Sequence, residues 1–193
     1  MRALVIEQGQ RGSEFAIAEV EEPTCKPGEV LIQVKAAGLN RADLLARDGA
    51  YTANKTLARE GFRRVGMEAA GLIEQIGSDV HGLTVGQRVM VMGGGTIAES
   101  LAVDARLVIP IPSNLGWSEA ASLPMAAATE YDALVTQGDL QAGQSVLILG
   151  ASSGVGVFGA QIAHWRGAQP VIGTTTSADK MSALLDYGVD MPV

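Results

Sequence analysis

The sequence SVLILGASSGVGVFGAQIAHWRGAQPVIGTTTSADK, residues 145–180, decides the fold of this chain. It begins with an apolar run at 146–149, whose length and composition predict a strand buried on both faces. A turn of small residues follows at 150–153, and a helical pattern begins at Gly154. A second apolar run at 170–173 ends in three threonines and a serine. This order predicts two parallel strands joined by a helix.

Gly154, Gly156 and Gly159 form a G-x-G-x-x-G motif at the start of the predicted helix. In such motifs one glycine permits positive φ in a tight turn, one lets a pyrophosphate approach the backbone, and one lets helix and strand pack closely. The helix N-terminus offers free N–H groups and partial positive charge to phosphates. With a strand before it and another after it, the motif predicts a dinucleotide site rather than a glycine-rich turn that only packs. The predicted contacts are Ala151, Ser152, Ser153, Gly154, Val155 and Gly156.

The end of the second strand indicates which dinucleotide is preferred. An NAD site usually has Asp or Glu there to bind the ribose hydroxyls, whereas this chain has residues with hydroxyl groups at 174–177. These hydroxyls and the Lys180 cation suit a 2′-phosphate, so the sequence favours NADPH, with Thr174, Ser177 and Lys180 as contacts. Alternatively, Ser177 and Asp179 only cap and charge a helix over 178–187, and Lys180 is solvated.

Composition excludes several classes of protein. The chain has 193 residues, 47% hydrophobic and 18% charged, which fits one or two globular domains. A net charge of −7 argues against a nucleic-acid partner. Since no apolar run reaches the length of a membrane span, and the N-terminus lacks a signal-peptide pattern, we expect a cytoplasmic protein. Cys25 is the only cysteine, so no internal disulfide can form.

The chain divides by pattern into a β-rich part, 1–117, and a mixed helix–strand part, 118–193. The first part predicts a β-barrel domain with one short helix at 41–46. Its strands are predicted at 1–7, 15–20, 29–36, 70–76, 88–92 and 100–108, with a turn over 8–13. In the second part, Ser118 is a candidate N-cap of a helix that reaches residue 135 with a kink at Pro124.

The mixed part supplies too few strands for a doubly wound sheet. Such a sheet needs about five or six parallel strands. Here there are two, or three if residues 189–193 form another, after a helix over 179–187 that Gly188 ends. Either the chain is truncated within this domain, or it completes its sheet with another copy as a homo-oligomer.

Five motifs together resemble one family, the medium-chain dehydrogenase/reductases, in the zinc-free quinone oxidoreductase (zeta-crystallin-like) branch. The stretches that carry the resemblance are AAGLNRAD at 36–43, RDGAY at 47–51, GMEAAG at 66–71, GQRV at 86–89 and ASSGVG at 151–156. The resemblance covers essentially the whole chain. It implies a GroES-like barrel followed by the first part of a Rossmann domain that binds NADPH.

The same resemblance predicts that no metal is bound. Zinc-dependent relatives use Cys and His ligands, but Asn40 stands where they place a cysteine and Met67 where they place a histidine. Residues 118–135 contain no cysteine for a third ligand, and the four-cysteine structural lobe is missing. His81 in a turn and His164 on a helix lie outside that pattern.

Without a metal, the resemblance implies direct hydride transfer to a quinone or an α,β-unsaturated carbonyl. Tyr51 is then the candidate donor to the acceptor oxygen, Asn40 faces nicotinamide and substrate, and Thr129 contacts the nicotinamide side. Each has a structural alternative: a half-buried barrel tyrosine, a turn-forming asparagine, and a helix threonine bonded to its own turn. For Glu68 a structural carboxylate is the expected role.

One segment departs from the family pattern. Residues 52–65 lack the usual prolines and carry Lys55, Arg59, Arg63 and Arg64. We expect this segment to flank the pocket, either as a solvated basic face or as an attraction for an anionic substrate or the NADPH phosphates. Competing hypotheses for the chain are an enoyl-thioester reductase of the same family, a non-catalytic nucleotide-binding or interaction module, and, third, a zinc alcohol dehydrogenase.

Overall fold

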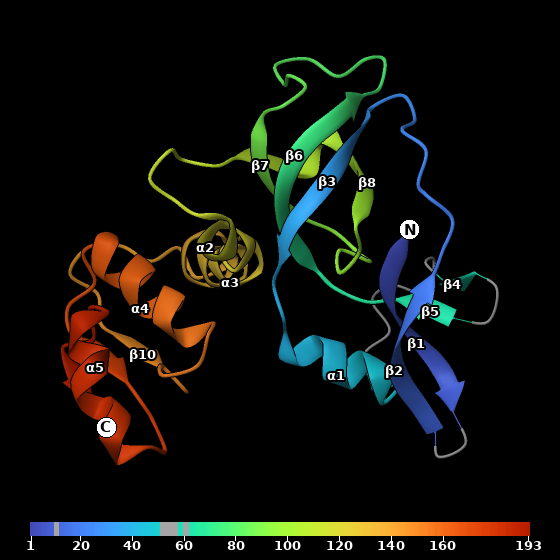
Figure 1. Cartoon of the computed structure of the whole chain (residues 1–193). Helices are drawn as coiled ribbons and strands as arrows, with labels where there is room; N and C mark the ends of the chain where they lie inside the picture. Colours follow the sequence, from blue (N-terminus) through green and yellow to red (C-terminus); the bar gives the residue numbers. More distant parts are fainter. Residues whose placement is uncertain (10–11, 51–57, 60–61) are drawn as a thin grey trace. The chain divides into compact units, whose positions relative to one another are not determined.

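The computed structural model describes residues 1–9, 12–50, 58–59 and 62–193. The chain forms two compact units, Met1–Pro124 and Met125–Val193 (Figure 1). All strand pairs described in the first unit are antiparallel, and all those in the second are parallel. A GroES-like antiparallel domain followed by the start of a Rossmann-like parallel sheet was the predicted fold class, and it is confirmed.

The first unit contains, within its described residues, a four-stranded and a five-stranded sheet. The smaller has the order β2-β1-β5-β4 and the larger β8-β3-β6-β7-β9. The strands are β1 (Arg2–Gly9), β2 (Gly12–Glu19), β3 (Glu29–Ala37), β4 (Ala58–Arg59), β5 (Phe62–Arg64), β6 (Glu68–Ile76), β7 (Arg88–Met92), β8 (Ser100–Asp104) and β9 (Val108–Pro110). Helix α1 (Arg41–Arg47) follows β3. Figure 1 shows β3 between β6 and β8.

The core of the larger sheet follows from alternation in the sequence. Val30 and Ile32 on β3 are fully buried, and they pack in one cluster with Ile73 of β6 and Val89 of β7. Because side chains alternate between the two faces of a strand, the intervening residues of β3 lie on the opposite face. The cluster therefore fixes the register of β3 between its neighbours.

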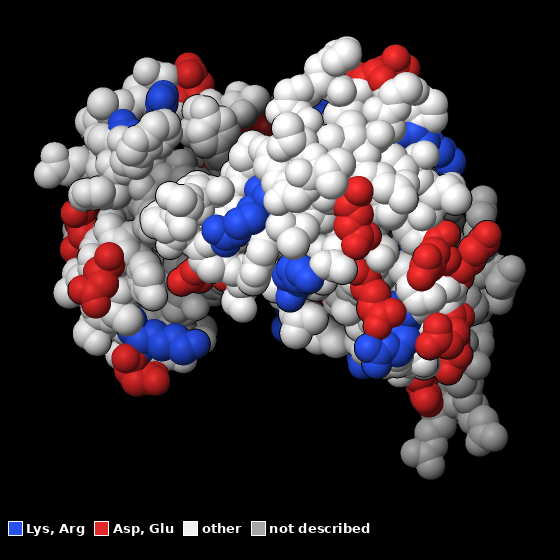
Figure 2. All heavy atoms as spheres, turned by 45° about the horizontal axis from the view of Figure 1, so that its top comes forward, with Lys and Arg blue, Asp and Glu red and all other residues white. Residues whose placement is uncertain are grey.

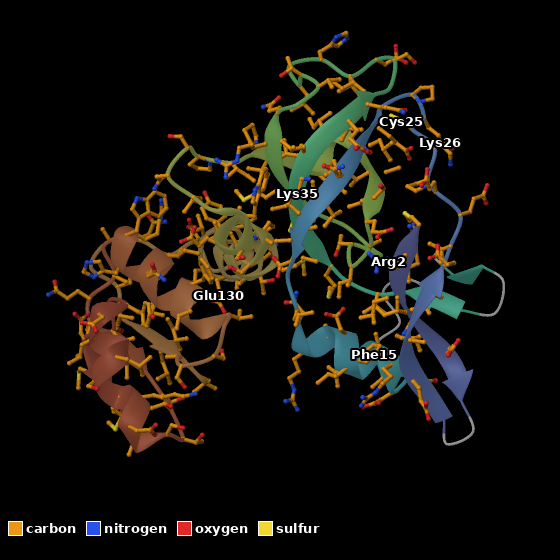
Figure 3. All side chains as sticks on the ribbon, in the orientation of Figure 1. Arg2, Phe15, Cys25, Lys26, Lys35 and Glu130 are labelled. Carbon is orange, nitrogen blue, oxygen red and sulfur yellow. The ribbon has the colours of Figure 1, made fainter. Side chains whose placement is uncertain are left out.

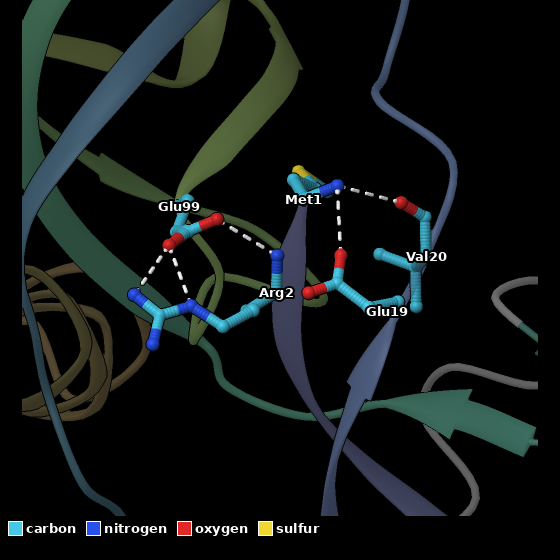
Figure 4. Close-up of polar contacts among 5 residues, drawn as sticks. All are labelled: Met1, Arg2, Glu19, Val20 and Glu99. Atoms are coloured by element: carbon cyan, nitrogen blue, oxygen red, sulfur yellow. Dashed lines mark hydrogen bonds and ion pairs between the residues drawn. The ribbon is translucent and has the colours of Figure 1, made fainter.

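Hydrogen bonds and an ion pair join the N-terminal residues to β2 and to the segment before β8. The backbone N–H of Arg2 donates to Glu99 Oε2 over 2.8 Å, and its guanidinium donates to Glu99 Oε1 (Figure 4). The Met1 ammonium donates to the carbonyl of Val20 and lies 3.5 Å from the carboxylate of Glu19. These contacts hold β1 at the junction between β2 and the segment before β8.

Two predictions for the first unit are corrected. The predicted turn at 8–13 is shorter, since β1 extends to Gly9 and β2 begins at Gly12. The single strand at 100–108 is two strands, β8 and β9, separated by the 3₁₀ turn η2 (Ala105–Leu107). The Asp104 carboxylate accepts from the backbone and side chain of Arg106, which caps this turn and lowers the pKa of Asp104 to about 2.

The predicted helix from Ser118 is also divided. Helix α2 (Trp117–Ala121) begins after an N-cap at Gly116, whose N–H donates to the Glu119 carboxylate, so Ser118 is not the cap. Pro124 does not kink a continuous helix; it is the first residue of α3 (Pro124–Tyr131). The first helical turn tolerates proline because no N–H is needed there. A π-helix, η3 (Asp132–Gln137), continues from α3.

The second unit contains a parallel sheet of order β10-β11-β12 in its described part. The strands are β10 (Val146–Ile148), β11 (Val171–Gly173) and β12 (Met191–Pro192). Helix α4 (Gly156–Trp165) joins β10 to β11, and η4 (Ala178–Lys180) with α5 (Met181–Asp186) joins β11 to β12. The third strand is therefore confirmed, and Gly188 at φ +87° ends the last helical segment.

One face of this sheet is covered and the other is open. Ile148 and Val171 pack in a cluster with Ala160 of α4 and Leu184 of α5. The prediction that the 146–149 strand is buried on both faces is wrong, because Leu147 and Leu149 are 59% and 77% exposed. They point away from α4 and α5, and no described element covers them.

Charge on the first unit is mixed in sign. Figure 2 shows acidic and basic side chains interspersed over the visible face of that unit. Among the described residues, none of the helices combines the length and apolar character that crossing a membrane requires.

Candidate functional site

The predicted dinucleotide loop lies between β10 and α4 and is held by the end of β11. The N–H of Ala151 donates to the carbonyl of Thr174 over 2.9 Å, and the N–H of Gly150 donates to Thr174 Oγ1 over 2.9 Å. The hydroxyls of Ser152 and Thr175 share a hydrogen bond of 2.8 Å. These three contacts fix the loop at the carboxyl edge of the sheet, which is where open α/β sheets bind ligands.

The glycines of the loop have structural roles that differ from those predicted for the motif. The residue with positive φ is Gly150, at +68°, which precedes the G-x-G-x-x-G motif, and Gly154 is not among the residues with positive φ. A Cβ on Gly156 would lie 2.4 Å from the Gly150 carbonyl oxygen, so this glycine lets the loop close against the start of α4. A Cβ on Gly159 would meet the Glu130 carboxylate at 2.6 Å, so Gly159 packs against α3 rather than a strand.

Several donors of the loop are available to a ligand. Ser153 Oγ accepts from the N–H of Gly156, and the N–H of Ser153 donates to the Gly150 carbonyl. The N–H groups of Ser152, Gly154 and Val155 have no acceptor among the residues that the structure describes. Ser153, Gly154 and Val155 are exposed. Unpaired N–H groups at an exposed helix start are the donors that phosphates bind. A pyrophosphate therefore fits this loop.

The segment after β11 presents hydroxyl groups and one ammonium group. Thr174 and Thr175 are used by the loop, and the N–H of Ser177 donates to Thr175 Oγ1 over 3.2 Å. Ser177 occupies the N-cap position of η4, but its side chain makes no capping hydrogen bond. Lys180 is exposed at the end of η4, and no described side chain forms an ion pair with it. Ser177 and Lys180 are thus both accessible to an additional phosphate.

Helix α3 places Thr129 and Glu130 in the second unit. Thr129 is exposed, and its hydroxyl donates to the Met125 carbonyl over 2.7 Å, which is the structural alternative stated for it. Glu130, labelled in Figure 3, is half-buried against Gly159 of α4. Burial raises the pKa of the Glu130 carboxyl. No periodic pattern indicates this contact, since it joins residues of two separate helices.

In the first unit, Asn40 connects α1 to β6. Its side-chain amide donates to Glu68 Oε1 over 2.9 Å, and its backbone N–H donates to Asp43 Oδ2 over 2.9 Å. Glu68 and Asp43 are only 3% and 7% exposed. Asn40 therefore caps α1 while its side chain is oriented by a buried carboxylate. Glu68 has the structural contact expected of it.

Tyr51 and most of the basic segment 52–65 lie outside the described residues. Arg63 and Arg64 are described, and they line a cavity of about 30 Å³ together with Asp43 and Met67. The remaining described residues of its lining are Ile6, Ala42, Ala46, Val65 and Gly66. Asp43 of this lining also accepts the backbone N–H of Asn40.

A metal centre has no ligand set in the described part of the chain. No group of three His, Cys, Asp or Glu side chains there is arranged to hold an ion. The asparagine and methionine at positions 40 and 67 explain this in part, because neither residue type commonly replaces a zinc-binding thiolate or imidazole.

Comparison with known proteins places the chain in one family. Residues 26–113 match the alcohol dehydrogenase GroES-like domain. The chain is 35% identical over 195 residues to the synaptic vesicle membrane protein VAT-1 homolog of Danio rerio, covering all of this chain and 39% of that protein. It is 36% identical over 157 residues to a highly reducing polyketide synthase of Penicillium soppii, covering 81% of this chain and 6% of that one.

Several solved structures have a fold similar to that of this chain over essentially its whole length. An alcohol dehydrogenase superfamily protein from Novosphingobium aromaticivorans has a TM-score of 0.87 and 33% identity, with 100% of this chain and 58% of that chain covered. A Pseudomonas syringae quinone oxidoreductase has a TM-score of 0.86 and 25% identity, again covering 100% and 58%. A mycobacterial protein complexed with NADPH has a TM-score of 0.86 and 27% identity, with the same coverage. The CurK enoyl reductase has a TM-score of 0.85 and 27% identity, covering 99% and 58%.

The fold is that of a GroES-like domain followed by the start of a Rossmann-like parallel sheet. The chain belongs to the medium-chain dehydrogenase/reductase superfamily. It spans about 58% of the length of the solved structures named above and 39% of the zebrafish relative.

Proposed function

We propose that this chain is the GroES-like and nucleotide-contacting part of a cytoplasmic, metal-independent NADPH oxidoreductase that reduces a quinone or an α,β-unsaturated carbonyl. The observation that carries the proposal is the loop at 150–156, with its unpaired N–H groups at the exposed start of α4. The similarity to the P. syringae quinone oxidoreductase supports the acceptor class. The similarity to the mycobacterial protein complexed with NADPH supports the cofactor.

NADPH fits the residues that the second unit presents. The N–H groups of the loop would hold the pyrophosphate. Ser177 and Lys180 would hold the 2′-phosphate, where an NAD site would place a carboxylate. Thr129 would contact the nicotinamide side of the cofactor. Bound NADPH supplies a hydride from its nicotinamide ring.

The chain's own residues would orient the acceptor and stabilise its charge. Asn40 is the side chain best fixed for this role, because the hydrogen bond to Glu68 restricts the rotation of its amide. Tyr51 remains the proposed donor to the acceptor oxygen, where negative charge develops during reduction.

Titration of the purified chain with NADPH and NADH, followed by nicotinamide fluorescence, tests the cofactor proposal. We expect NADPH to bind at least 10-fold more tightly, and its oxidation to be accelerated by quinones or enones. Activity that survives extensive chelation supports metal independence, whereas activity that requires restored zinc contradicts it. Binding without oxidation of NADPH by any acceptor would favour the non-catalytic nucleotide-binding module.

A second candidate is an enoyl-thioester reductase, which the similarity to the CurK enoyl reductase favours. The same residues would bind the cofactor in both cases, so the acceptor distinguishes them. Faster turnover of a 2-enoyl thioester than of any quinone would decide for this candidate.

A homo-oligomer is a separate proposal, suggested by the open face at Leu147 and Leu149, and sedimentation of the chain tests it.

A further inference from the structure

The cavity beside α1 contains an arginine that has no anionic partner among the residues that the structure describes. Arg64 ends β5 and lines the cavity with Asp43 and Met67. Its side chain is half-buried and forms no ion pair or hydrogen bond with any described residue. Burial lowers the pKa of Arg64, but a guanidinium stays charged at neutral pH. A partly buried guanidinium loses part of its hydration, and an anionic ligand would compensate for that loss.

The backbone is shaped to accommodate this side chain. Gly95 lies against Arg64 with φ +73°, and a Cβ there would come 3.2 Å from Arg64 Nε. A Cβ at this position would require Arg64 to shift by a few tenths of an ångström, and the positive φ itself favours glycine. Arg64 is therefore held at the cavity by the fold, in addition to being joined to β1 through the pairing of β5.

The described residues that line the cavity carry more positive than negative side chains. Arg63 donates to the carbonyl of Ala46, which is neutral, so its positive charge is not cancelled. Asp43 contributes one carboxylate, which already accepts the N–H of Asn40. Among the described lining residues there are thus two guanidinium groups and one carboxylate, on a chain whose net charge is −7. A lining of this composition favours a small anion over a cation.

We propose that Arg64 binds a carboxylate of the acceptor, so that the substrate is an enone or quinone carrying an anionic group. The inference rests on the proposed oxidoreductase function. A carboxylate matches the fork of guanidinium N–H donors and can form two parallel hydrogen bonds with it. The cavity volume of about 30 Å³ admits a group of this size rather than a whole substrate. The reacting part of the acceptor would then lie outside the cavity, on the side of Asn40.

Matched acids and esters test the proposal. Binding is measured as thermal stabilisation by 4-oxo-4-phenylbutanoate and by its methyl ester, which are unreactive ketones. We expect the acid to raise the Tm by about 3 °C at ten times its Kd, and the ester to have little effect. The Arg64→Gln variant should lose this difference. The Lys35→Gln variant, which removes an exposed cation of β3 (Figure 3), should keep it.

Turnover of the unsaturated pair, 4-oxo-4-phenyl-2-butenoate and its methyl ester, separates this inference from the proposed function. A roughly 10-fold preference in kcat/KM for the acid that Arg64→Gln abolishes supports both. Equal reduction of acid and ester leaves the oxidoreductase function standing and overturns the anionic substrate. If neither is reduced while the acid still stabilises the wild type selectively, the anion site stands and the proposed function fails.

The wild-type comparison needs no variant, so the proposal stays testable if Arg64→Gln does not fold. Equal stabilisation by acid and ester would be enough to reject it. The Arg64→Lys variant keeps the charge but cannot form the paired hydrogen bonds, so we expect it to bind the acid more weakly and with greater salt sensitivity. An arginine that only packs its hydrocarbon stem would show no preference between acid and ester.

Discussion

Asn40 and Glu68 are joined by a hydrogen bond of 2.9 Å between Nδ2 and Oε1, although 28 positions separate them in sequence. The bond links the N-cap of α1 to the first residue of β6. Glu68 is 3% exposed, so the bond is protected from water. A side chain that the family resemblance places beside the substrate is thus held by the core of the GroES-like unit. The proposed orientation of the substrate by Asn40 would therefore depend on a hydrogen bond that also stabilises the fold.

Replacing Glu68 with Ala should destabilise the chain by about 2 kcal/mol, because it leaves the Asn40 amide without its acceptor and opens a small cavity. Glu68→Gln keeps an acceptor oxygen of the same shape and should cost less than half as much. Urea denaturation followed by circular dichroism measures both. Equal loss in the two variants would show that the charge of Glu68, rather than its acceptor, is what the fold requires.

Periodic patterns in the sequence predicted the fold well where one face of an element is buried. Residues 29–35 are rich in β-branched and apolar residues, and β3 has the predicted start and ends one residue later. The division of 100–108 was not predictable from hydrophobicity, because the Asp104 side chain caps a 3₁₀ turn within an apolar run. Such side-chain to backbone hydrogen bonds compete with strand formation.

Only part of the candidate site was predictable from the sequence, because some of its contacts are local and others are not. The loop at 150–156 is local in sequence, so its strand–turn–helix context could be recognised. The role of Gly150 as the turn residue and the contact of Gly159 with Glu130 depend on backbone angles and on packing between helices. From the sequence alone, Arg64 is only one residue of a basic run. Its position at a cavity with Asp43 depends on contacts between segments distant in sequence.

Gly154 and Gly156 of the loop should respond differently to substitution by alanine. Gly156→Ala places a Cβ 2.4 Å from the Gly150 carbonyl, so we expect a loss of about 2–3 kcal/mol in stability and at least 10-fold weaker NADPH binding. Gly154→Ala meets no atom within 4 Å and should change the free energy of unfolding by less than about 0.5 kcal/mol. Thermal denaturation of each variant compares them. A larger loss for Gly154→Ala would contradict the described loop.

Lys180→Ala tests the preference for NADPH. The loss of an exposed cation near the 2′-phosphate should weaken NADPH binding about 10-fold, which is about 1.4 kcal/mol, and leave NADH binding unchanged. Its NADPH affinity should also depend less on salt than that of the wild type. Lys26→Ala removes an exposed lysine from the first unit (Figure 3) and serves as the control of equal charge. Equal weakening of NADPH and NADH binding would assign Lys180 to a general electrostatic role.

Glu130 should make the stability of the chain decrease with pH. Burial against α4 raises the pKa of its carboxyl in the folded state above the ordinary value of 4.5, so the folded protein binds the proton more tightly than the unfolded chain. Stability is therefore lost as pH rises from the ordinary to the raised pKa, and the loss persists at neutral pH. Glu130→Gln should be more stable than the wild type at pH 7, by about 0.5 kcal/mol or less given the partial exposure, and equal to it near pH 3.5. Denaturation at both pH values, with exposed Glu74→Gln as the control, measures the difference, and a gain that is the same at both would exclude titration of Glu130 as its cause.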